Sequence, residues 1–183
     1  MYTLTIPDYN DLWDEGKEEF VSRKGARIKI EHSLVSLAKW EQHYHKPFLG
    51  QSGKTFEESV YYIKCMTLTQ NVPDSVYLNI GSKEIEEVDA YINDSMTATQ
   101  FTKTEEKEGA SPHHEIMTNE LIYYYMIALQ IPVEFQKWHL NRLITLIEVC
   151  KRKNTPAKKM TAQQLAQHHQ SVNAKYRAKH RKR

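Results

Sequence analysis

Residues 149–183 contain no acidic residue, since the last one in the sequence is Glu148. Eleven of the 25 Lys and Arg residues follow that position, which leaves 14 basic against 23 acidic residues in residues 1–148. An acidic body of about −9 therefore precedes a segment of +11, and the formal net charge of +2 hides the division. Such asymmetry indicates a partner for the basic segment: nucleic acid, an acidic protein surface or the chain's own body.

Cysteine and long apolar runs are scarce as well. Cys65 and Cys150 each lie in an apolar helical pattern and are predicted to be buried free thiols, which fits a reducing, intracellular setting. The polar, acidic N-terminus indicates no signal peptide. The most apolar stretch, residues 121–131, is too short to span a bilayer, so we expect a soluble protein with no membrane partner.

Signatures of catalysis, cofactor binding and metal binding are missing too. Residues 50–55 look like a phosphate-binding loop, but Phe48 stands where that motif needs its first glycine. The nine histidines lack zinc-site spacing and are expected to be solvated. No serine stands in the Gly-x-Ser-x-Gly pattern of a nucleophile elbow. Neighbouring acids such as Glu57 and Glu58 point about 100° apart on a helix, so they form no shared site. The sequence predicts a non-catalytic protein with no cofactor and no metal.

The first thirty residues contain the only β signal that we interpret as a hairpin. Residues 1–17 are mixed in character and predicted to be irregular. Residues 18–31 have apolar pairs on either side of Lys24-Gly25, which predicts two strands joined by a turn at that dipeptide.

Helices are predicted for most of the remaining body. Thr55 and Glu58 form a capping box, in which each side chain bonds the other residue's backbone N–H. Residues 96–101 are predicted to be extended, and the charged residues 102–114 form the clearest loop. The apolar positions of the second helix are taken as Val60, Tyr61, Ile63, Cys65 and Leu68. We expect helices to begin at or after Ser33, Thr55, Pro73, Ser82, Thr118 and Pro132.

The helices after Thr118 and Pro132 are apolar over a wide arc and are predicted to be the centre of the core, the second running to about Lys153. Trp40 and Trp138 stand at helical spacing and are predicted to be core residues. The alternative for either one is an anchor for a partner, because tryptophan is frequent in binding hot spots.

Three consecutive tyrosines, Tyr123, Tyr124 and Tyr125, cover nearly the whole circumference of their helix. At least one ring must therefore face away from the core. Tyr123, Tyr124 and Trp138 are the aromatic candidates for partner contact.

The basic segment is predicted to be a helix-prone extension from Thr161 to about Lys179 that folds when a partner binds. A solvated tail, a protein-docking segment and a nucleic-acid arm all remain open, although Tyr176 alone offers base stacking. Its candidate contacts are Lys158, Lys159, Lys175, Arg177, Lys179, Arg181, Lys182 and Arg183.

Taken together, these patterns predict a mainly α protein. We expect a single helical domain with a small β-hairpin near the N-terminus, over residues 1–154, and a basic helix-prone C-terminal extension over residues 155–183.

Several runs resemble one family of small proteins encoded in the tail-gene modules of tailed bacteriophages, known as tail assembly chaperones or tail structural proteins. The runs are EHSLVSL at 31–37, KWE at 39–41, KPFL at 46–49, MTAT at 96–99, the stretch 120–150 with QKWHLNRL at 136–143, and Pro156 with KKM at 158–160. The resemblance covers about residues 29–175, and it departs from the family pattern at Gln100 and in the strongly basic run 175–183.

The resemblance implies a non-catalytic siphophage protein that binds the tape-measure protein or the tail-tube protein in the host cytoplasm during virion morphogenesis. It carries over no active site. One alternative is a structural component of the virion tail or neck; another is a nucleic-acid-binding protein acting through the basic tail. A homo-oligomer is compatible with each of them.

Overall fold

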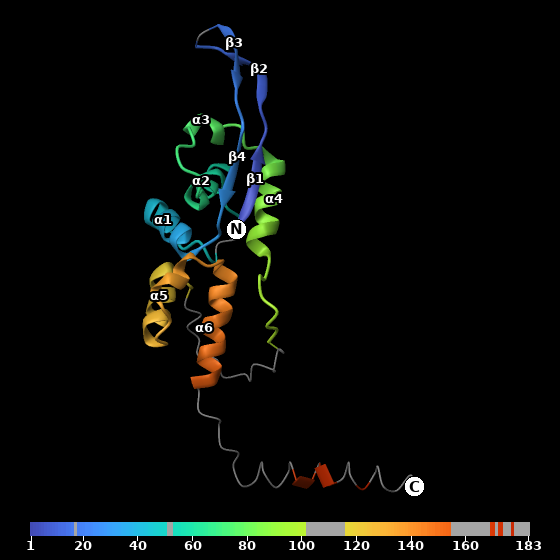
Figure 1. Ribbon diagram of the computed structural model, residues 1–183, viewed down its shortest axis with the longest axis vertical. Helices are drawn as coiled ribbons and strands as arrows, with labels where there is room; N and C mark the ends of the chain where they lie inside the picture. The colour runs from blue at the N-terminus through green and yellow to red at the C-terminus, as the bar shows by residue number, and fades with distance from the viewer. Residues whose placement is uncertain are drawn as a thin grey trace. The chain divides into compact units, whose positions relative to one another are not determined.

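The computed structural model describes residues 1–16, 18–50, 53–101 and 116–154, together with 169–170, 172–173 and 177. The chain forms two compact units, Met1–Cys150 and Lys151–Arg183. The first unit is mainly helical with a small antiparallel β element, as the sequence predicts (Figure 1).

The β element is built from four strands that pair two by two. β1 (Tyr2–Ile6) pairs antiparallel with β4 (Ala26–Ile30), and β2 (Tyr9–Asp14) pairs antiparallel with β3 (Glu19–Arg23). The prediction of irregular structure for residues 1–17 is therefore wrong. Leu4 and Ile6 supply one buried face of β1 and alternate with the exposed Thr3 and Thr5, which is the pattern of a half-buried strand.

The predicted hairpin of residues 18–31 is also corrected. Its two strands exist, but each pairs with an N-terminal strand and not with the other. The dipeptide Lys24-Gly25 is a bend between β3 and β4, and the chain reverses between Asp14 and Glu19. The result is one long hairpin with a bend halfway along it (Figure 1).

Gly25 makes the bend possible. Its backbone N–H donates to the carboxylate of Asp8 at 2.6 Å. A Cβ at this position would overlap the carbonyl oxygens of Ile6 and Pro7, so the close approach of the two backbones requires glycine. The buried Asn79 side chain holds the same bend, because its Nδ2 donates to the carbonyl oxygens of Pro7 and Arg23 at 3.2 Å each.

Helices make up the rest of the body. The capping box of Thr55 and Glu58 is confirmed, and Ser33 and Thr118 occupy the predicted N-cap positions. The elements are α1 (Leu34–Tyr44), α2 (Phe56–Met66), α3 (Asp74–Tyr77), α4 (Ser82–Asn93), α5 (Asn119–Ala128), the 3-10 helix η1 (Val133–Lys137) and α6 (Leu140–Asn154).

Three local predictions need correction. The cap of α4 is Gly81, whose N–H donates to the Glu84 carboxylate at 2.8 Å, so Ser82 is the first helical residue. Residues 96–101 form no strand, and Met96 has a φ of 49°. The helix expected from Pro132 is interrupted: η1 ends at Lys137, and α6 starts after two residues of non-helical chain. The loop predicted at 102–114 lies outside the described residues.

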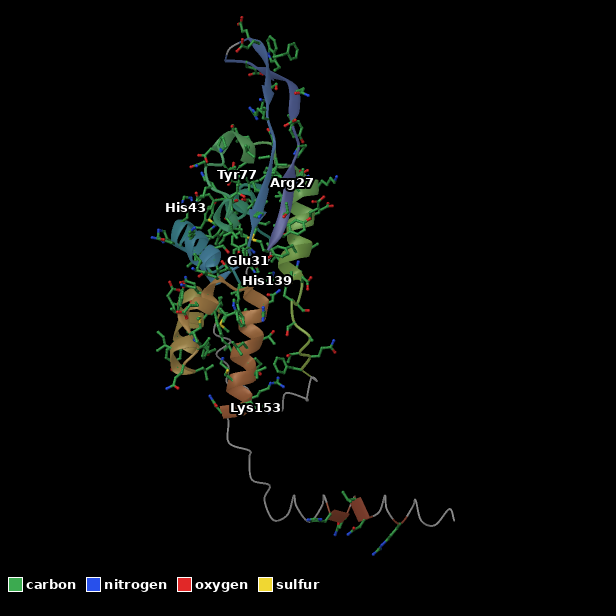
Figure 2. The ribbon with its side chains drawn as sticks, in the orientation of Figure 1. Arg27, Glu31, His43, Tyr77, His139 and Lys153 are labelled. Carbon is green, nitrogen blue, oxygen red and sulfur yellow. The ribbon has the colours of Figure 1, made fainter. Side chains whose placement is uncertain are left out.

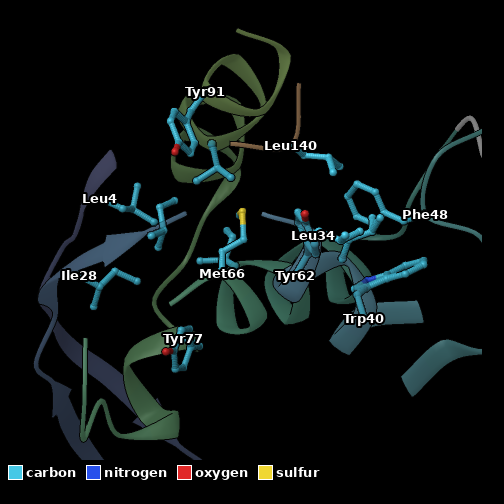
Figure 3. Packing of buried hydrophobic residues seen from close by; sticks show 14 of the residues in the cluster. Leu4, Ile28, Leu34, Trp40, Phe48, Tyr62, Met66, Tyr77, Tyr91 and Leu140 are labelled. Carbon is cyan, nitrogen blue, oxygen red and sulfur yellow. The ribbon is translucent and has the colours of Figure 1, made fainter. Parts of the chain in front are cut away.

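The core lies between the β1–β4 pair and the helices, and its centre is not the α5–α6 pair. Figure 3 shows Met66 of α2 between the sheet residues Leu4 and Ile28 on one side and Tyr62 on the other. Trp40 is fully buried, as predicted. No residue of η1 is buried, and the α5 and α6 residues in the core are Ile122, Met126, Leu140, Leu143 and Ile147.

The apolar positions predicted for α2 are confirmed in part: Ile63 is buried, and Val60, Tyr61 and Cys65 pack against the core without being fully buried. The buried apolar residues of the helix are Tyr62, Ile63 and Met66, whereas Val60 and Tyr61 are half-buried. Leu68, beyond the helix end, is exposed. The helix has apolar residues on two faces, and periodicity alone does not distinguish them.

The two cysteines are free thiols but are half-buried. Burial raises the pKa of the Cys65 thiol to about 11, so it is protonated near neutral pH.

We predict that Gly25→Ala lowers the free energy of unfolding by about 1–3 kcal/mol, because the new methyl group overlaps two backbone carbonyls. Urea unfolding followed by circular dichroism measures the change. Lys24→Ala gives the neighbouring, exposed position the same alanine side chain without adding any atom to the bend, and serves as the control. Equal stability of the two variants would show that the bend tolerates a side chain.

Candidate partner-binding surface

Glu41 of α1 holds the start of α5. Its carboxylate is buried and accepts the backbone N–H of Phe48 at 2.7 Å and that of Asn119 at 2.8 Å. The side-chain amide of Asn119 donates to the same carboxylate at 2.6 Å. Hydrogen bonds to a buried charge are among the stronger ones, so the N-terminus of α5 is firmly attached to α1.

The start of α6 is attached at the other end of the η1 segment. The backbone N–H of Leu140 donates to the His32 carbonyl at 2.7 Å, and Ser33 and His139 form an isolated antiparallel bridge. The Asn141 side chain donates to the carbonyl oxygens of Ile92 and Asp94 at 2.8 and 2.7 Å. The helices on both sides of η1, α5 and α6, are therefore each attached at their N-termini by hydrogen bonds.

His32 and His139 meet inside this junction, and the expectation of solvated histidines is wrong for both. Their rings contact each other edge to face with centroids 5.1 Å apart, and each residue is buried. A hydrogen bond of 2.6 Å joins His32 Nδ1 and the Tyr62 hydroxyl. Figure 2 shows His139 next to Glu31, where the sheet ends.

Burial disfavours the charged form of both imidazoles. The pKa of His32 falls from 6.5 to about 3, chiefly through desolvation and further through the neighbouring His139 and Lys54. Desolvation also lowers the pKa of His139. Both rings are neutral near pH 7, and they act in packing and hydrogen bonding.

Aromatic side chains pack together on η1 and at the residue that follows it. Trp138 stacks on Phe135 with ring centroids 4.0 Å apart, and the Arg142 guanidinium lies 4.0 Å from the centre of the Trp138 ring. The Tyr123 hydroxyl donates to the Gln136 side chain at 2.8 Å and links α5 to η1. Trp138 is half-buried, so the prediction of a core residue is wrong. The alternative, an anchor for a partner, stays a prediction.

Large apolar side chains on α5 and η1 are exposed. Tyr124 is 62% and Ile127 78% exposed, and their spacing of three residues places them on one side of α5. Val133 of η1 is 57% exposed. The expectation that at least one of the three tyrosines faces outward is confirmed by Tyr124. We call the following residues the α5–η1 surface: Tyr123, Tyr124, Ile127, Val133, Phe135, Trp138 and Arg142.

Four residues of this surface were not identified as candidates from the sequence: Ile127, Val133, Phe135 and Arg142. The contact of Arg142 with Trp138 joins the first turn of α6 to a non-helical residue that precedes it, so helical spacing does not predict it. Phe135 had been assigned to a core helix, and its stacking depends on the break after η1, which the pattern does not reveal.

Of the eight basic candidates for partner contact, Arg177 is among the described residues. Arg177 is helical and exposed in the second unit. Lys158, Lys159, Lys175, Lys179, Arg181, Lys182 and Arg183 lie outside the described residues, as does the predicted capping position Thr161.

Comparison of the chain with protein-family models, with curated proteins and with solved structures gave no match. Within the described parts of the chain, no helix is long and apolar enough to cross a membrane. Over the same residues, no group of three or more His, Cys, Asp or Glu side chains is arranged to hold a metal ion.

We predict that stability falls as the pH drops below 6.5, by about 1.4 kcal/mol per pH unit for His32 alone. The unfolded chain takes up a proton on this imidazole below 6.5, while the folded chain does so only near its lowered pKa of about 3, so acid favours unfolding. Urea unfolding at several pH values between about 4.5 and 7.5 measures the slope.

His32→Asn keeps a polar partner for Tyr62 but removes the titrating ring, and should flatten the slope. His43→Asn, at an exposed position of α1, is the matched control and should keep it. A wild-type slope in His32→Asn would assign the pH dependence to other groups.

Proposed function

We propose that this chain is a phage tail-morphogenesis protein, a non-catalytic tail assembly chaperone that binds the tape-measure or tail-tube protein in the host cytoplasm. The resemblance in residues 31–49, 96–99 and 120–160 gives the class of protein. We further propose that residues 1–154 act as one helical domain and residues 155–183 as a basic, helix-prone extension.

The observation that supports this role best is the α5–η1 surface. It exposes large apolar side chains at Tyr124, Ile127 and Val133, and it includes the stacked pair of Phe135 and Trp138. Exposed apolar groups of this kind favour a binding role, since aromatic residues and arginine are enriched at interfaces.

The attachment of the surface also fits a chaperone. Glu41 fixes α5 and the His32–Leu140 hydrogen bond fixes α6, so the backbone that carries the aromatic rings is preorganised. Preorganisation lowers the entropic cost of binding a flexible partner. A tape-measure segment with apolar helical faces is a partner of suitable chemistry.

Affinity purification from infected host cells, with nuclease treatment and high-salt washing, tests the proposal. We expect mass spectrometry to identify the tape-measure or tail-tube protein. Tyr124→Ala/Ile127→Ala should reduce the recovered partner at least tenfold without changing the melting temperature, because both side chains are exposed.

Leu78→Ala is the matched control, since Leu78 is a comparably exposed apolar residue next to α3. Equal recovery by the double variant and the wild type would exclude the α5–η1 surface as the binding site. Stoichiometric amounts of the protein in purified virions would favour a structural component of the tail or neck.

The basic segment supports a second candidate, nucleic-acid binding. Eight of its basic residues lie in 155–183, where no acidic residue opposes them. We expect any such binding to weaken steeply with salt, with a log–log slope set by the number of phosphates contacted, and to vanish on truncation after Asn154. Fluorescence anisotropy with a labelled duplex measures both, and truncation without effect would exclude the tail.

A further inference from the structure

The outer half of the bent hairpin carries an aromatic pair that the core does not use. Trp13 on β2 and Phe20 on β3 are cross-strand partners, and their rings meet edge to face with centroids 5.1 Å apart. Trp13 is 54% and Phe20 66% exposed. We call residues 8–20 the hairpin tip, which extends beyond α3 and α4 in Figure 1.

Folding alone gives little reason for these two rings. The sheet residues in the buried core are Leu4, Ile6, Ile28 and Ile30, all of which belong to β1 and β4. A two-stranded hairpin is marginally stable in water without a face packed against something else. The contact between the two rings contributes roughly 0.2–1 kcal/mol to the hairpin. Each residue is nevertheless more than half exposed, so the pair forms an apolar surface that another molecule can cover.

The charge of the hairpin tip selects the kind of partner. Residues 8–20 contain six acidic residues and one lysine. Asp8, Glu15, Glu18 and Glu19 are exposed. This density of negative charge repels nucleic acid and a second hairpin tip, and it attracts a positively charged segment.

Other aromatic rings of the molecule have a cation against one face. Trp138 is capped by Arg142, and the Phe48 ring has the Lys54 ammonium 3.9 Å from its centre. Among the described residues, no Lys or Arg is found over Trp13 or Phe20. Cations bind favourably on the faces of tryptophan and phenylalanine rings, and Trp13 and Phe20 are each more than half exposed.

We propose that the hairpin tip binds a Lys- or Arg-bearing, partly apolar helical segment of a partner protein. The cationic heads lie against the aromatic faces and the carboxylates, and apolar side chains of the segment cover the rest of the ring pair. This site is separate from the α5–η1 surface and does not depend on the tail-assembly role.

Binding of a labelled 18-residue helical peptide of Lys, Leu and Ala to the full chain, followed by fluorescence anisotropy, tests the proposal. Its counterpart with Glu in place of Lys is the charge control. The wild type should bind the Lys peptide, less tightly at high salt, and should not bind the Glu peptide.

Trp13→Ala/Phe20→Ala should weaken binding at least tenfold and leave the melting temperature unchanged, since neither ring is part of the core. Glu15→Gln/Glu18→Gln/Glu19→Gln should weaken binding and reduce its salt dependence. Leu78→Ala, an exposed apolar position outside the hairpin, should bind as the wild type does.

Three results would overturn the proposal. Unchanged affinity of the aromatic double variant would leave only unspecific charge attraction. Equal binding of the Glu peptide would remove the charge argument. A wild-type dimer in sedimentation velocity that Trp13→Ala/Phe20→Ala dissociates would make a second copy of the chain the occupant.

Discussion

The backbone of residues 31–33 is the point on which the fold depends. The Glu31 N–H donates to the Met66 carbonyl, so the end of β4 is attached to the end of α2. The backbone carbonyl of the following residue, His32, accepts the N–H of Leu140 of α6, and Ser33 caps α1. Glu31 also accepts the Tyr91 hydroxyl of α4 at 2.7 Å. Three residues thus connect the sheet to four helices, and the buried imidazoles lie where those connections meet.

Local signals in the sequence predict the helices well because capping chemistry involves residues three apart. Ser33 and the pair of Thr55 and Glu58 are examples, since each satisfies N–H groups within its own turn. Strand pairing is different. β4 pairs with β1 more than twenty residues earlier, and a local hairpin is indistinguishable from this arrangement by pattern alone. The break after η1 also depends on distant contacts, because His139 bridges to Ser33.

The residues of the candidate surfaces also divide into those that local sequence patterns predict and those that depend on distant contacts. The sequence predicts that at least one of Tyr123, Tyr124 and Tyr125 faces outward, because three consecutive helical tyrosines cannot all face one core, but the structure is needed to show that it is Tyr124. Trp138 and Trp13 required the structure, since the exposure of an aromatic residue depends on which elements pack over it. The two aromatic surfaces differ in charge: Arg142 covers the ring at Trp138, whereas the segment that contains Trp13, residues 8–20, has six acidic residues and one lysine. Surfaces of opposite local charge select different partners.

The adjacent residues Trp138 and His139 have unlike surroundings. One ring is part of a half-exposed stack, and the other is sealed against His32 and the Tyr91 carbonyl. A ligand that binds Trp138 therefore contacts the residue next to His139, which is buried at the junction of the sheet and the helices. Such a ligand recognises only the folded chain, and mass action then raises the melting temperature with ligand concentration. Thermal shift thus reports occupancy of this surface even when the ligand itself is spectroscopically silent.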